Sequence, residues 1–292
     1  MKKIIVILGP TGVGKTKLSV ELAKRLNGEI INADSMQIYK GLDIGTAKIK
    51  EEEKEGIPHH LFDIKEVRED YSIYNYQIDG RKVINDIIKR GKTPIIVGGT
   101  GLYIKSLLYD YNLNYEKECD TYDTLSTEEL YNKLLELDKN AVVDKNNRRR
   151  VIRAINYYKE NNKSISDNKT NKLLYDVVFI GLTTDREKLY QIINSRVNKM
   201  INDGLINEVK KFFDEGIYSK PLINGIGYKE LYKYFEKEIS LEEAIEKIKQ
   251  NSRRYAKRQY TFFNNQLPVV WFNVDFNCFS NVINSVCDYL KK

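Results

Sequence analysis

The order of apolar and polar positions divides roughly the first hundred residues into alternating strands and helices. Residues 4–8 form an uninterrupted apolar run, which is typical of a strand buried on both faces of a parallel sheet. Residues 15–26 carry leucine at every fourth position, which predicts an amphipathic helix. The pattern continues with a strand at 29–34, a helix at 72–90, a strand at 95–97 and a further helix after Gly101. Such alternation predicts a parallel sheet that binds ligands at the carboxyl ends of its strands.

The middle of the chain has a different pattern. Between residues 112 and 176 we find no strand pattern, but helical periodicity at 128–137 and 147–158 and a polar segment at 160–172. A buried-strand pattern returns at 177–182 and again at 269–272. We therefore predict an α/β fold, a parallel sheet flanked by helices with a small helical insertion, divided into segments 1–112, 113–176 and 177–292.

Two helices of the last segment have recognisable starting signals. Thr184 with Glu187, and Ser240 with Glu243, have the spacing of capping boxes, in which a hydroxyl and a carboxylate satisfy the first amides of a helix. The first box predicts a helix that reaches Asp203. The second predicts a helix of roughly 20 residues.

Composition narrows the class of protein. The 292 residues carry 48 Lys and Arg against 41 Asp and Glu, a formal net charge of +7. No apolar run approaches the ~20 residues of a membrane-spanning helix, and the apolar stretch after Met1 leads into a glycine loop, not a signal-peptide cleavage site. The three cysteines lack the spacing of a disulfide framework or a zinc site. We expect a cytoplasmic protein, without membrane contact, that acts as a monomer.

The strongest local motif follows the first predicted strand and opens the first helix. It fits the pattern G-x-x-x-x-G-K-[ST] of a phosphate-binding P-loop in the required context, and it consists of Gly9, Pro10, Thr11, Gly12, Val13, Gly14, Lys15 and Thr16. Glycines allow backbone amides to turn inward, the helix N-terminus adds positive potential, and Lys15 adds a full charge. The threonine hydroxyl can bind Mg²⁺ that bridges phosphate oxygens. The motif predicts a P-loop NTPase-like sheet that binds a phosphate compound.

Two further features could take part in catalysis or binding. Asp34 ends the second predicted strand and is followed by Ser35, Met36 and Gln37, so its carboxylate can support a magnesium ion, cap a helix or hold a polar molecule. Basic residues concentrate at 148–153 and at 249–258, where five Lys or Arg occur without an acid. A basic helix is usually a solvated face, but it is also what an RNA-binding surface requires.

Several segments together resemble one family. The P-loop is followed by ADSMQIY (33–39), GLDIGTAK (41–48), GIPHHL (56–61), VGGTGLY (97–103), RVIRA (150–154), GIGYKE (225–230) and YAKRQ (255–259). In this order and spacing the chain resembles the bacterial tRNA dimethylallyltransferases, also called tRNA isopentenyltransferases, over nearly its whole length.

The resemblance implies an activity. The dimethylallyl group of dimethylallyl diphosphate would pass to N6 of the adenosine at position 37 of tRNA, next to the anticodon. In this reaction the P-loop holds a departing diphosphate, with Mg²⁺ on Thr16. The resemblance implies that Asp34 is the base for the acceptor amine and that Thr100 hydrogen-bonds near the reacting centre.

The resemblance also implies residues that contact the anticodon stem-loop of tRNA. They are Asp34, Ser35, Met36, Gln37, Thr100, Arg149, Arg150, Arg153, Gly227, Tyr228, Lys229, Arg253, Arg254, Lys257, Arg258 and Gln259. A structural alternative for Arg254 and Arg258 is ion pairing with the glutamates at 242, 243 and 246. We expect the adjacent His59 and His60 to be structural, because neighbours on an extended segment point to opposite faces.

Two other functions share some of these features. A nucleotide or small-molecule kinase would have the same P-loop and parallel sheet, and the arginines at 148–153 could then form a lid over the phosphates. A non-catalytic P-loop protein would bind tRNA and leave the adenosine unmodified. Assays for dimethylallyl transfer and for ATP consumption separate these alternatives.

Overall fold

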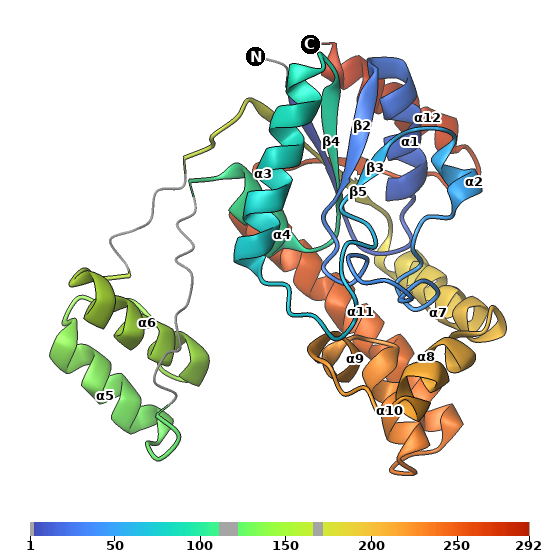
Figure 1. The fold of residues 1–292 in the computed structure, drawn as a ribbon. Helices are drawn as coiled ribbons and strands as arrows, with labels where there is room; N and C mark the ends of the chain where they lie inside the picture. Colours follow the sequence, from blue (N-terminus) through green and yellow to red (C-terminus); the bar gives the residue numbers. More distant parts are fainter. Residues whose placement is uncertain (1–2, 111–121, 166–171, 292) are drawn as a thin grey trace. The chain divides into compact units, whose positions relative to one another are not determined.

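A six-stranded sheet organises the structure, a computed structural model that describes residues 3–110, 122–165 and 172–291. The strand order is β3-β2-β4-β1-β5-β6, and each neighbouring pair is parallel (Figure 1). The strands are β1 (Ile4–Leu8), β2 (Gly28–Asn32), β3 (His59–His60), β4 (Thr93–Gly98), β5 (Val177–Thr183) and β6 (Val270–Asn273). All of β1 is buried, as the apolar run predicted, so the phosphate motif follows a central strand of the sheet.

Helices cover both faces of this sheet. Helices α1 (Lys15–Leu26) and α12 (Phe279–Leu290) lie on one face, and α3 (Ile73–Lys89) and α4 (Gly101–Leu108) lie on the other (Figure 1). The remaining helices of this part are α2 (Glu51–Lys54), α7 (Arg186–Asn202), α8 (Leu205–Asp214), α9 (Lys220–Asn224), α10 (Tyr228–Phe235) and α11 (Leu241–Gln266). The predicted α/β architecture is confirmed.

The chain divides into two units. The larger, which we call the core unit, comprises Met1–Leu108 and Leu173–Lys292, and the smaller, the insertion unit, comprises Tyr109–Lys172. The insertion unit contains α5 (Thr127–Leu137) and α6 (Arg148–Asn161), which bury leucine and valine side chains against each other. No strand is found among the residues that the structure describes between 122 and 165.

The two predicted helix starts have different outcomes. Ser240 and Glu243 form the capping box of α11. The box predicted at Thr184 is wrong: Asp185 is the N-cap of α7, and its carboxylate accepts from the amides of Glu187 and Lys188. An aspartate is a stronger N-cap than a threonine, so the helix begins one residue later than the pattern suggested.

A buried carboxylate ties the edge of the sheet together. Glu29 on β2 is almost fully buried and contacts His60 (2.6 Å), Arg90 (2.6 Å) and Lys92 (2.9 Å). Burial opposes ionisation of Glu29, but the three hydrogen-bonding partners outweigh it and lower its pKa to about 2. His60 therefore has a structural partner. Within the described residues, no helix has the length and apolar character needed to cross a bilayer.

Candidate active site

The phosphate loop joins β1 to α1 and has the backbone that its glycines allow. Gly9, Gly12 and Gly14 have φ values of 141°, 86° and 90°, which side chains other than glycine rarely tolerate. Gly14 is the N-cap of α1, so no cap side chain hydrogen-bonds the first amides of this helix. These amides and the helix dipole provide a site for an anion.

Lys15 is folded back onto this loop. Its Nζ donates to the carbonyl oxygens of Gly9 (3.0 Å) and Pro10 (2.8 Å). Burial and then the nearby charge of Arg196 lower the pKa of Lys15, the charge of Asp34 partly opposes them, and together they set it at about 7. The ammonium group thus lacks a full counter-charge, which an anionic ligand would supply.

Asp34 is held rigidly just after β2. Its amide donates to Oδ1 of Asn32 (2.9 Å), and its own Oδ1 accepts from the amide of Met36 (2.9 Å). The Asn32 side chain also donates to the carbonyls of Asp34 (3.1 Å) and Leu61 (3.0 Å). No described residue hydrogen-bonds Oδ2 of Asp34, which leaves one carboxylate oxygen able to accept from a ligand.

The loop after β4 completes this side of the site. Thr100 Oγ1 accepts from the amide of Ser35 (3.2 Å), and the Gly99 carbonyl accepts from Nε2 of Gln259 on α11 (2.9 Å). A Cβ on Gly99 would lie 2.1 Å from Nε2 of Gln259, and one on Gly101 would lie 2.2 Å from the Phe262 ring. The glycines of the predicted GGTG segment therefore allow α11 to pack directly on the end of the sheet.

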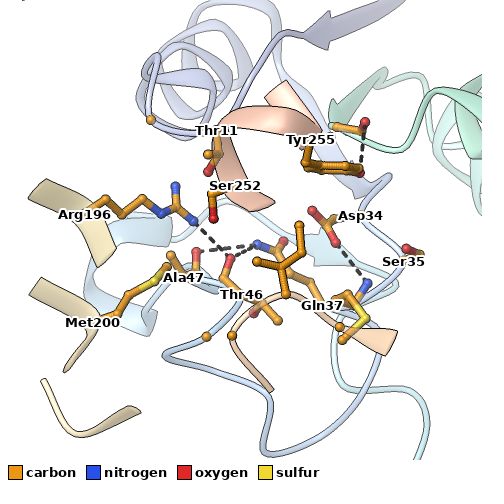
Figure 2. Close-up of a pocket in the computed structure, with 18 of the residues that line it drawn as sticks. Thr11, Asp34, Ser35, Gln37, Thr46, Ala47, Arg196, Met200, Ser252 and Tyr255 are labelled. Atoms are coloured by element: carbon orange, nitrogen blue, oxygen red, sulfur yellow. Dashed lines mark hydrogen bonds between the residues drawn. The ribbon is translucent and has the colours of Figure 1, made fainter. Parts of the chain in front are cut away.

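One glutamate holds the loop at residues 43–45, which lies across the site from the loop after β4. Glu208 on α8 accepts from the amides of Asp43 (3.1 Å), Ile44 (2.7 Å) and Gly45 (3.1 Å) and from the hydroxyl of Tyr228 (2.6 Å). The loop formed by residues 43–46 has a second contact, in which the Thr46 carbonyl accepts from Nε2 of Gln37 (3.0 Å; Figure 2). Tyr228, which the resemblance places among the tRNA contacts, is buried yet lines the cavity, and its hydroxyl supports the loop through Glu208.

These segments enclose a cavity of about 690 Å³. It brings together Thr11, Gly12, Gly14, Lys15, Thr16, Asp34, Ser35, Met36, Gln37, Gly227, Tyr228, Lys229, Arg258 and Gln259 from the predicted set. Asp34 is the only acidic side chain among the described lining residues, whereas Lys15, Arg196, Lys229 and Arg258 supply cations. The cavity therefore suits an anionic ligand that meets a single hydrogen-bond-accepting carboxylate.

Arg196 is a site residue that the sequence analysis missed. It lies on α7, lines the cavity, donates to the Thr46 carbonyl (3.3 Å) and forms no ion pair with a described acidic residue (Figure 2). Burial lowers its pKa, and the charge of Asp34 partly opposes this. An available signal was its position between Ile193 and Val197, which places a charged side chain on the buried stripe of the helix.

Comparison with known proteins identifies the family. A family model described as IPP transferase matches residues 37–266, and one described as isopentenyl transferase matches residues 2–71. The tRNA dimethylallyltransferase of Anoxybacillus flavithermus is 52% identical over 300 residues, covering 99% of this chain and 96% of the relative. The chain belongs to the tRNA dimethylallyltransferase family. The Geobacillus thermodenitrificans tRNA dimethylallyltransferase is 50% identical, covering 94% of this chain and 91% of its own.

Solved structures of the family share the fold. The tRNA delta(2)-isopentenylpyrophosphate transferase of Staphylococcus epidermidis superposes with a TM-score of 0.77 at 42% identity and covers 100% of this chain and 99% of that one. A eukaryotic dimethylallyltransferase acting on tRNA superposes with a TM-score of 0.87 at 30% identity and covers 100% of this chain and 80% of that one. The predicted family and the P-loop fold are confirmed.

The basic residues of α11 occupy different environments. Arg254, Lys257 and Arg258 are exposed, whereas Arg253 donates to Oδ1 of Asn194 (2.6 Å) and is half-buried. Among the described acids, neither Arg254 nor Arg258 has an ion-pair partner, since Glu243 caps Ser240 and Glu246 pairs with Lys249 (2.7 Å). The structural alternative for these two arginines is therefore not supported.

The basic residues of the insertion unit are also divided. Arg149, Arg150 and Arg153 are exposed on α6. Arg148 instead donates to the carbonyls of Tyr122 and Leu125 and connects α6 to the segment before α5. The arginines expected to contact tRNA are thus the ones turned outward within this unit.

Some predicted site residues do not line the cavity. Of the described core-unit residues, Gly9, Pro10, Val13, Thr100, Arg253, Arg254 and Lys257 do not line it. Gly9 and Pro10 still bind Lys15 through their carbonyls, and Thr100 holds Ser35. Gly9, Pro10 and Thr100 therefore set the geometry of groups that face the cavity.

Proposed function

We propose that the chain transfers the dimethylallyl group from dimethylallyl diphosphate to N6 of the adenosine at position 37 of tRNA. The observation that carries this proposal is the single carboxylate of Asp34 in a cavity whose charged side chains are otherwise cationic. Membership of the tRNA dimethylallyltransferase family supports the same reaction. A phosphate site beside one proton acceptor matches a diphosphate leaving group and an amine nucleophile.

The P-loop end of the cavity would bind the diphosphate. In the reaction the bond between C1 of the allyl group and the diphosphate oxygen breaks, and the diphosphate leaves with the bonding electron pair. Negative charge grows on that oxygen, so the loop amides, Lys15 and Arg196 stabilise the transition state more than the ground state. Lys15 would leave its two loop carbonyls for the incoming anion.

Mg²⁺ fits this site as a partner of the diphosphate. The Thr16 hydroxyl lines the cavity at the start of α1 and would be the protein ligand. No group of three or more His, Cys, Asp or Glu residues in the described parts of the chain could hold an ion without substrate. Mg²⁺ commonly binds through a few protein oxygens, substrate phosphates and water. When bound, it would neutralise charge on the leaving group.

Asp34 would act on the acceptor. The N6 amine is a weak nucleophile because its lone pair is delocalised into the adenine ring. The Oδ2 oxygen of Asp34 would accept a hydrogen bond from the amine, orient it and take its proton as N6 bonds to C1. Thr100 and Asn32 hold this part of the chain in place, so they are positioning residues in the proposal.

The exposed cations would hold the tRNA while one base enters the cavity. An adenosine inside a stacked loop is out of reach, so it must be turned out into the site. Arg254, Lys257 and Arg258 on α11 would contact phosphates near the cavity, with Lys229 at its wall. Arg149, Arg150 and Arg153 would contact other phosphates from the insertion unit.

The test combines transfer to tRNA with one substitution. Purified protein is incubated with dimethylallyl diphosphate, Mg²⁺ and unmodified tRNA, and the nucleosides are analysed by mass spectrometry. Asp34→Asn should lower kcat by about 10²–10⁴-fold and leave tRNA affinity largely unchanged, because an amide keeps the shape but accepts no proton. Asp70→Asn is the matched control, since Asp70 is exposed and pairs only with Lys220 among the described residues. Absence of the prenylated nucleoside with the unaltered chain would refute the proposal, and phosphoryl transfer from ATP would favour a kinase.

A further inference from the structure

Tyr255 is a cavity residue that has no role in the reaction proposed above. It lies on α11, is half-buried, and lines the cavity. Figure 2 shows its ring edge-on above Asp34, so that one ring face is turned toward the carboxylate and the cavity. Burial and then the charge of Asp34 raise the pKa of Tyr255 to about 12, which is consistent with this closeness. The phenol is therefore neutral at physiological pH.

The ring is held in place before any ligand binds. Its hydroxyl donates to the Gly99 carbonyl (3.5 Å), which also accepts from Gln259 (2.9 Å). The guanidinium of Arg258 lies over the ring, 5.6 Å from its centroid. An aromatic ring fixed from both the sheet end and the helix loses little conformational entropy when a flat ligand packs on it.

The acceptor base needs such a surface. The hydrogens of the N6 amine lie in the plane of adenine, so a hydrogen bond to Asp34 holds the base by its edge and leaves its faces open. A base turned out of its stack loses the contacts of its neighbours, and enzymes that act on such bases commonly replace them with aromatic or apolar side chains. Asp34 alone therefore cannot hold the plane of the base.

We propose that Tyr255 is the stacking platform for the adenine that is turned out of the tRNA, with its ring covering one face of the base while Asp34 binds the edge. This inference rests on the proposed function and names the residue that would orient its acceptor. It assigns Arg258 a second role, which is to hold the Tyr255 ring in place.

The other aromatic residues of the cavity wall are less suitable. Tyr228 is fully buried and its hydroxyl is used by Glu208. His59 and Phe62 pack edge-to-face against each other, with ring centroids 5.8 Å apart. Among the described lining residues, Tyr255 is thus the aromatic side chain that lies beside Asp34.

The experiment uses an anticodon stem-loop RNA with 2-aminopurine at position 37. This base cannot react, because its amine is at C2, and its fluorescence is quenched when it stacks on an aromatic ring. The RNA is titrated with the unaltered chain, with Tyr255→Phe and with Tyr255→Leu. Affinity is measured in parallel with adenosine at position 37.

The expected results separate the ring from the hydroxyl. Bound RNA should be quenched by the unaltered chain and by Tyr255→Phe, whereas Tyr255→Leu should lose the quenching. The leucine variant should also bind the adenosine RNA about 5- to 100-fold more weakly, and the phenylalanine variant within about twofold of normal, since the value of stacking resides in the ring. Donor affinity should not change in either variant.

Two outcomes would overturn the stacking role. One is equal fluorescence of the RNA bound to the unaltered chain and to Tyr255→Leu; the other is equal loss of quenching in both variants, which would assign the effect to the hydroxyl. Transfer of dimethylallyl by the unaltered chain is measured on the adenosine RNA in the same series. If transfer occurs and either outcome is found, only the stacking inference fails; if no transfer occurs, the proposed function fails.

Discussion

The low pKa of Lys15 predicts that binding of the donor takes up a proton. In the absence of a ligand, burial and the neighbouring Arg196 lower the pKa of this lysine to about 7. A diphosphate in the loop adds negative charge beside the ammonium and removes its need for the loop carbonyls. Both effects favour the protonated form, so the pKa in the complex should return toward its ordinary value.

The size of the effect follows from these two states. With a pKa of about 7, Lys15 is roughly 3% protonated at pH 8.5, so nearly one proton should enter with the donor at that pH and about half a proton at pH 7. The direction of the pH dependence follows: affinity for the donor is highest at a pH where Lys15 is already protonated, and it falls as the pH rises. Between pH 7.5 and 8.5 the apparent Kd of the donor should increase about eightfold.

Calorimetry in buffers of different ionisation enthalpy measures this uptake. The titration uses dimethylallyl diphosphate between pH 7.5 and 9.5, above the ionisation of the terminal phosphate near pH 6. Lys15→Ala should bind more weakly and lose the uptake. Lys17→Ala is the matched control, because Lys17 is exposed on the same helix and contacts the Phe279 ring instead of the loop carbonyls. An uptake that persists in Lys15→Ala, or a donor Kd independent of pH, would refute the reasoning.

Three other variants test separate parts of the molecule. Replacing Arg254 and Arg258 with glutamine should weaken tRNA binding and reduce the magnitude of the log–log salt slope by roughly 0.7–0.9 for each lost phosphate contact; an unchanged slope with a lowered melting temperature would show a structural role instead. Arg196→Gln should raise the KM for the donor and lower kcat without changing tRNA affinity, because the lost charge faces the diphosphate, and normal donor kinetics would remove Arg196 from the mechanism. Glu29→Gln should cost about 3 kcal/mol of unfolding free energy at neutral pH. Because the pKa of Glu29 is lowered from 4.5 to about 2, this contribution is complete above pH 4.5 and disappears as the pH falls toward 2, so acid titrations of the two proteins should converge there.

The phosphate site could be predicted from the sequence because its chemistry is local. Eight consecutive residues contain the glycines that the loop backbone requires and the lysine that binds the anion. The apolar run before them predicts a strand, and the leucine repeat after them predicts a helix. Asp34 and the GGTG segment could also be placed, since both follow strands of a sheet whose parallel order the alternation predicts. In each case a few neighbouring residues determine the geometry.

The remaining site residues depended on packing between distant segments. Arg196, Glu208 and Tyr255 sit on helices whose patterns are ordinary, and each meets its partner across more than a hundred residues of sequence. Helical periodicity predicts which face of a helix is apolar, but it does not predict which loop that face will pack against. The same limit applies to the hydrogen bond between Tyr228 and Glu208, because it depends on how α8 packs beside α10 and has no local signal in the sequence. The phosphate loop and the strand ends thus follow from local sequence patterns, whereas the walls of the cavity depend on how α7, α8 and α11 pack against them.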